Sequence, residues 1–121
     1  MTNPFKDQER FMTACDQSVG DQNIRQYELY YGLIKEEVAE LLAAHQDGDS
    51  IEQLDALIDI LVVTIGALHS MGVDAEGAWN EVMRTNFAKI NPETGKVNKR
   101  HDGKVLKPEG WQPPDLKPYF K

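Results

Sequence analysis

Six carboxylates in two groups are the residues of this sequence whose types and spacing could do chemistry. The first group lies within residues 36–40 and the second within residues 52–59: Glu36, Glu37 and Glu40, then Glu52, Asp55 and Asp59. Acidic residues three or four positions apart share one face of a helix. Their oxygen atoms are the ligands that Mg²⁺ or Mn²⁺ prefers, and no matching histidine or cysteine pattern indicates iron or zinc. The spacing therefore predicts a divalent metal site between two helices.

Two of these carboxylates occupy positions where a helix is otherwise apolar. At about 100° per residue, Glu37 falls in the middle of an apolar stripe that runs from Tyr30 to Leu41. Asp59 is the only charged residue in the segment 56–68. A carboxylate facing a helical core destabilises the fold unless it has a cationic partner or becomes neutral. Few basic residues are available on these helices, so a metal ion is the favoured partner.

The outermost acids of the two groups also allow an ordinary structural interpretation. Glu36 lies just off the ligand face and is the kind of residue that forms a solvated surface. Glu52 belongs to the first turn of its expected helix, where a negative charge complements the helix dipole. These two acids are therefore weaker evidence for a metal site than Glu37 and Asp59.

Helical periodicity predicts the elements that must position these groups. The expected helices cover residues 4–17, 21–46, 50–71 and 74–89. Asp21 and Asp74 are expected N-caps, and Ser50 with Gln53 forms an expected capping box. Four helices with short connections predict an all-α, antiparallel bundle in a single domain over residues 1–121.

The C-terminal segment differs from this helical body of about residues 4–89. Five of the six prolines lie from Pro92 onward, so residues 90–121 are expected to form a turn-rich tail with a short hairpin around Asp102-Gly103. The tail is also basic: it has 4 acidic and 7 basic residues, whereas residues 1–89 have 16 acidic and 6 basic. An acidic body that binds metal beside a basic segment that binds phosphate fits this asymmetry.

Composition excludes several other classes of protein. The chain has 121 residues and a formal charge of −7, which argues against binding to nucleic acid. No apolar run reaches the roughly 20 residues that cross a bilayer, so a soluble, cytoplasmic protein without membrane contact is expected. Cys15 is the only cysteine and cannot form an internal disulfide. The helix expected at 50–71 is apolar almost all round, which predicts a homodimer or homotetramer.

The acidic motifs resemble those of the all-α nucleoside triphosphate pyrophosphohydrolases, which include MazG proteins, phosphoribosyl-ATP pyrophosphohydrolases and dimeric dUTPases. Glu36-Glu37-x-x-Glu40 is similar to the first family motif, E-E-x-x-E, and the acids within 52–59 resemble the second, E-x-x-D. The Arg-x-Asn-x-x-Lys pattern in 81–89 and the Asp-Gly-Lys-Val-Leu-Lys segment at 102–107 look like parts of small, phage-type MazG-like members. The resemblance implies a MazG-like bundle that is completed by oligomerisation.

The resemblance also implies a reaction and a role for each group. The reaction is metal-dependent hydrolysis of a (deoxy)nucleoside triphosphate between its α- and β-phosphates, which gives the monophosphate and pyrophosphate. Two or more Mg²⁺ or Mn²⁺ ions would be held by Glu37, Glu40, Asp55 and Asp59, with Glu52 assisting. Glu36 would orient or deprotonate the attacking water, and Glu37 is the alternative for that role. The triphosphate would be bound by Arg84, Asn86, Lys89, Lys104 and Lys107.

Several alternatives stay open at the level of sequence. The second motif fits either Glu52 with Asp55 or Asp55 with Asp59. Trp111 could stack on the nucleobase or anchor the tail. By analogy with phage-type members the favoured substrate is a purine deoxynucleotide such as dGTP, and dUTP and phosphoribosyl-ATP are the alternatives. A different class of protein, a non-catalytic metal-binding helical interaction module, would also explain the apolar helices and acidic charge, but not the acids on packing faces.

Overall fold

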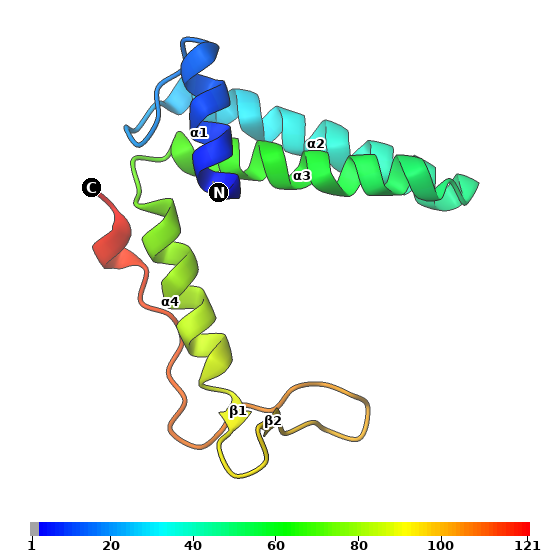
Figure 1. The fold of residues 1–121 in the computed structure, drawn as a ribbon, viewed down its shortest axis with the longest axis vertical. Coiled ribbons are helices and arrows are strands. Elements are labelled where there is room, and N and C mark those ends of the chain that lie inside the picture. The colour runs from blue at the N-terminus through cyan, green and yellow to red at the C-terminus, as the bar shows by residue number, and fades with distance from the viewer. Residues whose placement is uncertain (1–2) are drawn as a thin grey trace. The chain divides into compact units, whose positions relative to one another are not determined.

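The computed structural model describes residues 3–121, and within them the chain is mostly helical (Figure 1). Its elements are α1 (Pro4–Ala14), α2 (Ile24–Asp47), α3 (Ser50–His69), α4 (Ala75–Phe87), β1 (Ile90–Asn91), β2 (Lys96–Val97) and the 3₁₀-helix η1 (Lys117–Tyr119). The all-α class predicted from the sequence is confirmed. The chain divides into two compact units: the first ends at Ala75 and takes in Lys121, and the second is Glu76–Phe120. Helix α4 therefore groups with the tail, and the single domain stays a prediction.

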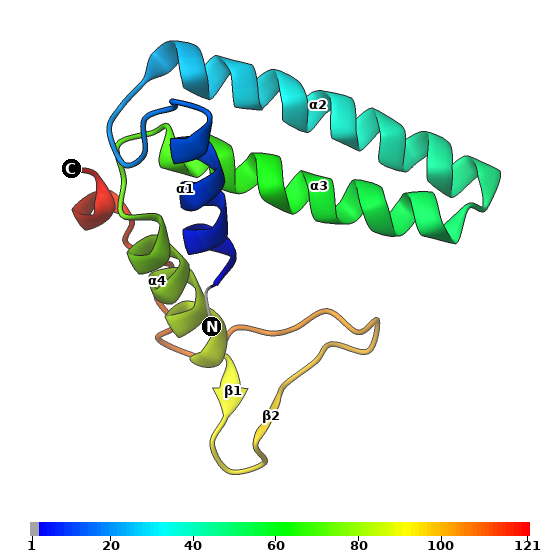
Figure 2. The same ribbon diagram turned by 45° about the horizontal axis from the view of Figure 1, so that its top comes forward.

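The first unit is a long helical hairpin with a shorter helix packed against it. Helices α2 and α3 run antiparallel and side by side, and α1 packs against α3 (Figures 1 and 2). The turn between α2 and α3 is short because Gly48 adopts a left-handed conformation, with φ 66°, that ends α2. Asp49 follows directly, and its side chain accepts a hydrogen bond from the Glu52 amide at the start of α3.

The buried core lies at the end of the hairpin that α1 covers. Met12, Tyr30 and Ala67 form its centre, one residue from each helix of this unit. Tyr30 fits against α3 because Gly66 has no side chain: a Cβ there would lie 2.3 Å from a ring carbon of Tyr30. The Tyr30 hydroxyl donates a hydrogen bond to the side chain of Gln17. This end of the hairpin is therefore held by three packed helices.

A buried glutamine completes the same end. The Gln26 amide group accepts a hydrogen bond from the Ser18 N–H (3.1 Å) and donates to the Ser18 carbonyl and the Ser70 hydroxyl (2.8 Å each). Gln26 and Ser70 are both buried. Because buried polar groups destabilise a fold unless they are paired, this network fixes the loop after α1 against the ends of α2 and α3.

Several predicted helix ends differ from the structure by one to three residues, among them the end of α3 at His69 rather than residue 71, and three have a local explanation. Helix α1 ends at Ala14 rather than residue 17, because Asp16 takes a left-handed conformation with φ 59°. Asn23 rather than Asp21 caps α2, since its side chain accepts from the Gln26 amide at 3.1 Å. Asp49 rather than Ser50 caps α3. Each observed cap is an Asn or Asp, whose carbonyl or carboxyl oxygen accepts from the third amide of its helix as well as a serine would.

The second unit consists of α4 and an irregular C-terminal segment. Helix α4 ends at Phe87, two residues before the predicted end, and the chain then enters the small antiparallel hairpin of β1 and β2, which the sequence did not predict. The hairpin expected around Asp102-Gly103 is confirmed, because Lys99 and Val105 pair in an antiparallel bridge. Within residues 3–121, no helix is both long and apolar enough to cross a membrane.

Candidate active site

The six predicted acids divide into inner and outer positions on the α2–α3 hairpin. Glu37 is half-buried on α2, on the face that also carries Tyr30 and Ala44 toward the interior. Asp59 is half-buried on α3, three residues after the buried Ala56. The other four are exposed: Glu36, Glu40, Glu52 and Asp55. Their roles as ligands or catalytic groups stay predictions, but Glu37 and Asp59 are the two that lie on the packing faces.

Glu37 has an unusual environment for a carboxylate. Its Oε2 atom is buried and has no hydrogen-bond partner in the part of the chain that the structure describes. The pKa of Glu37 is raised above its ordinary value, first by burial, next by a hydrogen bond with Glu40, and then by the negative charges of Glu40, Asp59 and Asp55. Acids from both helices therefore act on one carboxylate, and they disfavour its charged form.

Among the described residues, no basic side chain forms an ion pair with these acids. The ion pairs found among residues 3–121 are Lys6–Glu9, Arg84–Glu81 and Arg100–Asp102, and none of them includes one of the six acids. Lys35, on the same helix as Glu37, lies with its ammonium 5.3 Å from the centre of the Tyr31 ring. A structural salt bridge is therefore not the explanation for the inward position of Glu37.

The acids approach one another without forming a finished metal site. Among the described residues 3–121, no three Asp, Glu, His or Cys side chains are placed so that they could hold a metal ion as they stand. The donor chemistry still suits a hard cation, since every nearby group is a carboxylate and one buried oxygen has no partner. The predicted ligands are thus neighbours across two helices, and their side chains do not converge.

Glu52 belongs to a different part of the hairpin from Asp59. A shallow hollow of about 330 Å³ at the tip of the hairpin is lined by Glu40, Ala43, Ala44, Asp47, Asp49 and Glu52. Glu52 is not among the acids that raise the pKa of Glu37, whereas Asp55 and Asp59 are. Of the two ways to place the second motif, the one with Asp55 and Asp59 puts its acids beside Glu37.

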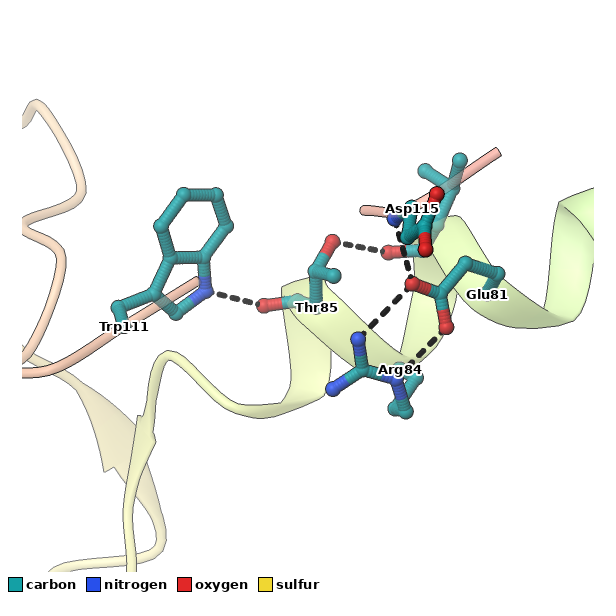
Figure 3. Close-up of polar contacts among 6 residues, drawn as sticks. Glu81, Arg84, Thr85, Trp111 and Asp115 are labelled. Carbon is teal, nitrogen blue, oxygen red and sulfur yellow. Dashed lines mark hydrogen bonds and ion pairs between the residues drawn. The ribbon is translucent and has the colours of Figure 1, made fainter. Parts of the chain in front are cut away.

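The predicted phosphate-binding residues lie in the second unit, and the structure brings some of them together at Trp111. The Trp111 indole N–H donates a 2.7 Å hydrogen bond to the Thr85 carbonyl near the end of α4 (Figure 3). The ammonium groups of Lys89 and Lys107 lie 5.2 and 4.8 Å from the centre of the Trp111 ring. Lys89 also donates to the Asn86 side chain at 3.1 Å. Trp111 therefore connects α4 to the tail, and two lysine ammonium groups lie over its ring.

Arg84 is occupied by a partner that the sequence analysis missed. Its guanidinium donates two hydrogen bonds to the Glu81 carboxylate, at 2.7 and 2.9 Å, and the same carboxylate accepts the Asp115 backbone N–H at 2.8 Å (Figure 3). These bonds lower the pKa of Glu81 to about 2. The i, i+3 spacing of Glu81 and Arg84 is a signal that was available in the sequence. The contact with Asp115 was not, because 34 residues separate it from Glu81.

Lys104 is placed apart from this cluster, on the 99–105 hairpin. Its backbone N–H donates to the Asp102 carboxylate at 3.1 Å, and its carbonyl accepts from the Arg100 N–H at 2.8 Å. Arg100 is itself paired with Asp102. The backbone of this turn is therefore well held, while the Lys104 side chain is exposed.

Comparison with known proteins agrees with this geometry. A helical fold with paired acids across two antiparallel helices has the features of the all-α nucleotide pyrophosphohydrolases, the class that the sequence resembles. Residues 8–86 match the family model of phosphoribosyl-ATP pyrophosphohydrolase, and the chain belongs to this family. A search of curated proteins finds no match. The predicted enzyme class, a nucleotide pyrophosphohydrolase, is thereby confirmed.

The family match ends within the set of residues predicted to bind phosphate. The matched segment contains the six predicted acids and extends to Asn86, so it also includes Arg84. Lys89, Lys107 and Trp111 lie beyond its end. The acidic hairpin therefore lies within the part of the chain that matches the family, and the lysine cluster at Trp111 lies outside it.

Proposed function

We propose that this protein hydrolyses a nucleoside triphosphate between the α- and β-phosphates and releases a monophosphate and pyrophosphate. The observation that carries the proposal is the buried, unpartnered Oε2 of Glu37, with the acids of both helices around it. Such an arrangement destabilises a helical hairpin, so its presence is better explained by a ligand than by folding. Membership of a pyrophosphohydrolase family supplies the reaction class.

The acids of the hairpin are the proposed holders of Mg²⁺ or Mn²⁺. Glu37, Glu40, Asp55 and Asp59 supply oxygen ligands from both helices, and Glu52 would contribute from the hollow at the hairpin tip. Small side-chain rotations are needed, since these groups do not yet converge. Divalent ions bound there would neutralise phosphate oxygens and lower the pKa of a bound water.

The remaining predicted residues are proposed to bind substrate and to accept a proton. Glu36 is exposed beside Glu37 and is proposed to accept the proton of the attacking water, with Glu37 as the alternative. Lys89 and Lys107 are proposed to bind the phosphates as point charges. Arg84 uses two of its donors on Glu81 and has others left for a phosphate oxygen. Asn86 and the exposed Lys104 complete the proposed phosphate-binding set.

The identity of the nucleotide is the finer part of the proposal. We propose a purine deoxynucleotide such as dGTP, by analogy with small phage-type members. Phosphoribosyl-ATP is the second candidate, because the matched family is named for that substrate. Hydrolysis of either compound would use the same acids and the same phosphate-binding residues, so the two candidates differ only in how the base and its substituent are held.

An exposed apolar stripe on α3 supports the proposed oligomer. Ile51, Leu54, Ile58 and Leu61 repeat at helical spacing, and between half and four-fifths of each residue is exposed, from 50% for Ile58 to 79% for Ile51. An apolar face of this size is normally covered by another chain. We propose a second copy as the cover, in a homodimer or homotetramer. Analytical ultracentrifugation should show a dimer or tetramer that Leu54→Glu shifts toward monomer, and a monomeric wild-type chain would refute it.

The activity is tested by product analysis. The purified protein is incubated with dGTP, dUTP, other nucleoside triphosphates and phosphoribosyl-ATP in the presence of Mg²⁺ or Mn²⁺. The expected products are pyrophosphate and the monophosphate, with the fastest turnover for a purine deoxynucleotide. Release of orthophosphate would contradict the proposed position of cleavage. No turnover with any compound would contradict the proposal and favour a non-catalytic metal-binding module.

A further inference from the structure

Two positive charges converge on one tryptophan in the second unit. The Lys89 and Lys107 ammonium groups are both within the distance at which a cation is attracted to an indole face, about 6 Å from the centroid. Both distances are measured to the centre of the Trp111 ring, so the separation of the two ammonium groups is at most the sum of these distances. Lys89 comes from just after α4 and Lys107 from the distant tail, so Trp111 is what they share.

The arrangement lacks the negative partner that two ammonium groups would normally acquire. Neither lysine takes part in an ion pair within residues 3–121. Glu81, an acid of α4, is already bonded to Arg84 and to the Asp115 amide. Two like charges held near one ring repel each other, and an anion that contacts both would relieve the repulsion.

The Trp111 ring is itself fixed in position. Its N–H donates to the Thr85 carbonyl at 2.7 Å (Figure 3), and Trp111 is half-buried. Thr85 is buried, and its hydroxyl bonds to the Val82 carbonyl at 2.7 Å. A side chain held in this manner has little freedom left, so it can fix the directions of groups that rest on it.

We propose that Trp111 is a positioning residue, which holds Lys89 and Lys107 as one pair for the phosphates of the substrate. The proposal rests on the proposed function and gives Trp111 a role other than stacking on the nucleobase. A diphosphate or triphosphate has several negative oxygens along a short chain and can contact both ammonium groups at once. Loss of the ring would leave each lysine on a flexible stem and weaken phosphate binding through lost preorganisation.

The binding experiment uses inorganic pyrophosphate without metal, so that it does not depend on turnover. The chain has two tryptophans, and the Trp79→Phe variant leaves Trp111 as the only one. Pyrophosphate is expected to change the Trp111 fluorescence in a saturable manner. Calorimetry is expected to show about tenfold weaker binding for Lys89→Met, Lys107→Met and Trp111→Leu, as for a lost charge-assisted bond. Lys96→Met, which removes another exposed lysine of the same unit, should bind as wild type does.

Two further variants distinguish positioning from a structural role. Trp111→Phe keeps an aromatic face but loses the bond to the Thr85 carbonyl, so its pyrophosphate affinity should lie between those of the wild type and Trp111→Leu. The double variant Trp111→Leu with Lys107→Met should bind little more weakly than Trp111→Leu alone, because the lysine contributes through the ring. Additive losses, or a Trp111→Phe variant as weak as Trp111→Leu, would overturn the proposal. So would a fluorescence response to deoxyguanosine equal to that with pyrophosphate, which would favour base stacking.

The outcome is separable from that of the proposed function. If pyrophosphate binds as expected but no triphosphate is hydrolysed, the positioning role stands and the proposed function fails. If triphosphates are hydrolysed to pyrophosphate but Trp111→Leu leaves the KM unchanged, the function stands and the role of Trp111 fails. With both correct, Trp111→Leu raises the KM by about tenfold and changes kcat little.

Discussion

Glu37 in the first unit and Glu81 in the second are both half-buried glutamates on helices, and their surroundings are opposite. Glu81 receives two hydrogen bonds from Arg84 and one from the Asp115 amide, and its pKa falls to about 2. Glu37 has one buried oxygen without a partner among the described residues, and burial and neighbouring acids raise its pKa. The Glu81 carboxylate is hydrogen-bonded within the fold on both oxygens, whereas the Glu37 carboxylate has an oxygen available to a ligand.

The difference shows how a chain separates stability from chemistry. A carboxylate such as Glu81, which accepts hydrogen bonds on both oxygens, fastens the tail to α4. An unsatisfied one such as Glu37 weakens the hairpin, and such a weakness is retained when a ligand supplies what the fold does not. The hairpin tolerates it because Tyr30, Gly66 and Gln26 hold the other end together.

The largest expected effect comes from removing the charge of Glu37. Glu37→Gln should lower the rate of pyrophosphate release by about 10³-fold, as for loss of a catalytic carboxylate. Thermal unfolding followed by circular dichroism should show equal or higher stability, because the repulsion by neighbouring acids is relieved. Glu28→Gln, an exposed glutamate on the same helix, is the control and should change neither quantity. An unfolded Glu37→Gln variant would show that this carboxylate is structural.

The second experiment gives Glu37 the kind of partner that Glu81 has. Asp59→Lys places an ammonium group opposite Glu37 and should lower the pKa of that carboxyl. The thermal midpoint should rise by a few degrees, and pyrophosphate release should fall to background because the positive charge opposes a metal ion. The exposed Glu28→Lys variant carries the same kind of charge change and should leave turnover near that of the wild type. A less stable, still active Asp59→Lys protein would contradict the comparison.

A smaller effect is expected when Glu81 is neutralised. Glu81→Gln removes the ion pair with Arg84 and weakens the acceptor of the Asp115 amide, so the C-terminal segment should detach from α4 more often. Limited trypsin digestion followed by mass spectrometry should show cleavage within residues 90–120 that is several-fold faster than in the wild type. Glu93→Gln is the matched control in the same unit. Equal cleavage rates for Glu81→Gln and the wild type would show that this contact does not hold the tail.

The smallest expected effect is on the pH dependence of stability, to which Glu81 and Glu37 should contribute in opposite directions. The folded pKa of Glu81 is below its ordinary value of 4.5, so its stabilisation is present above pH 4.5 and is lost as the pH falls toward 2. The folded pKa of Glu37 is raised, so its ionised form destabilises the fold at neutral pH, and this is relieved as the pH falls toward 4.5. The free energy of unfolding should be measured for the wild type and Glu81→Gln from pH 5 to 2, and for the wild type and Glu37→Gln from pH 7 to 5. Relative to its variant, the wild type should lose stability as the pH falls in the first series and gain stability in the second. Changes in the same direction in both series would refute the opposite pKa shifts of Glu81 and Glu37.

The helical elements could be predicted because their signals are local. The apolar stripe of α2, the turn at Gly48 and the proline-rich segment after residue 91 each depend on neighbours in the sequence. The caps were less certain, because Asp21, Asn23, Asp49 and Ser50 are all good capping residues. Which of them acts depends on where the preceding loop leaves the backbone. The loop before α2 is held by a hydrogen bond to Gln26. The turn before α3 is determined by the left-handed conformation of Gly48.

For the candidate site, the sequence by itself determined which acids occupy apolar positions, because helical periodicity assigns Glu37 and Asp59 to the packing faces without further information. Only the tertiary structure decided which groups meet. The pairing of Glu81 with Asp115 and the approach of Lys89 to Trp111 join segments far apart in the chain. The charge state and burial of a side chain depend on these contacts, and the sequence pattern does not give the distances between the contacting groups.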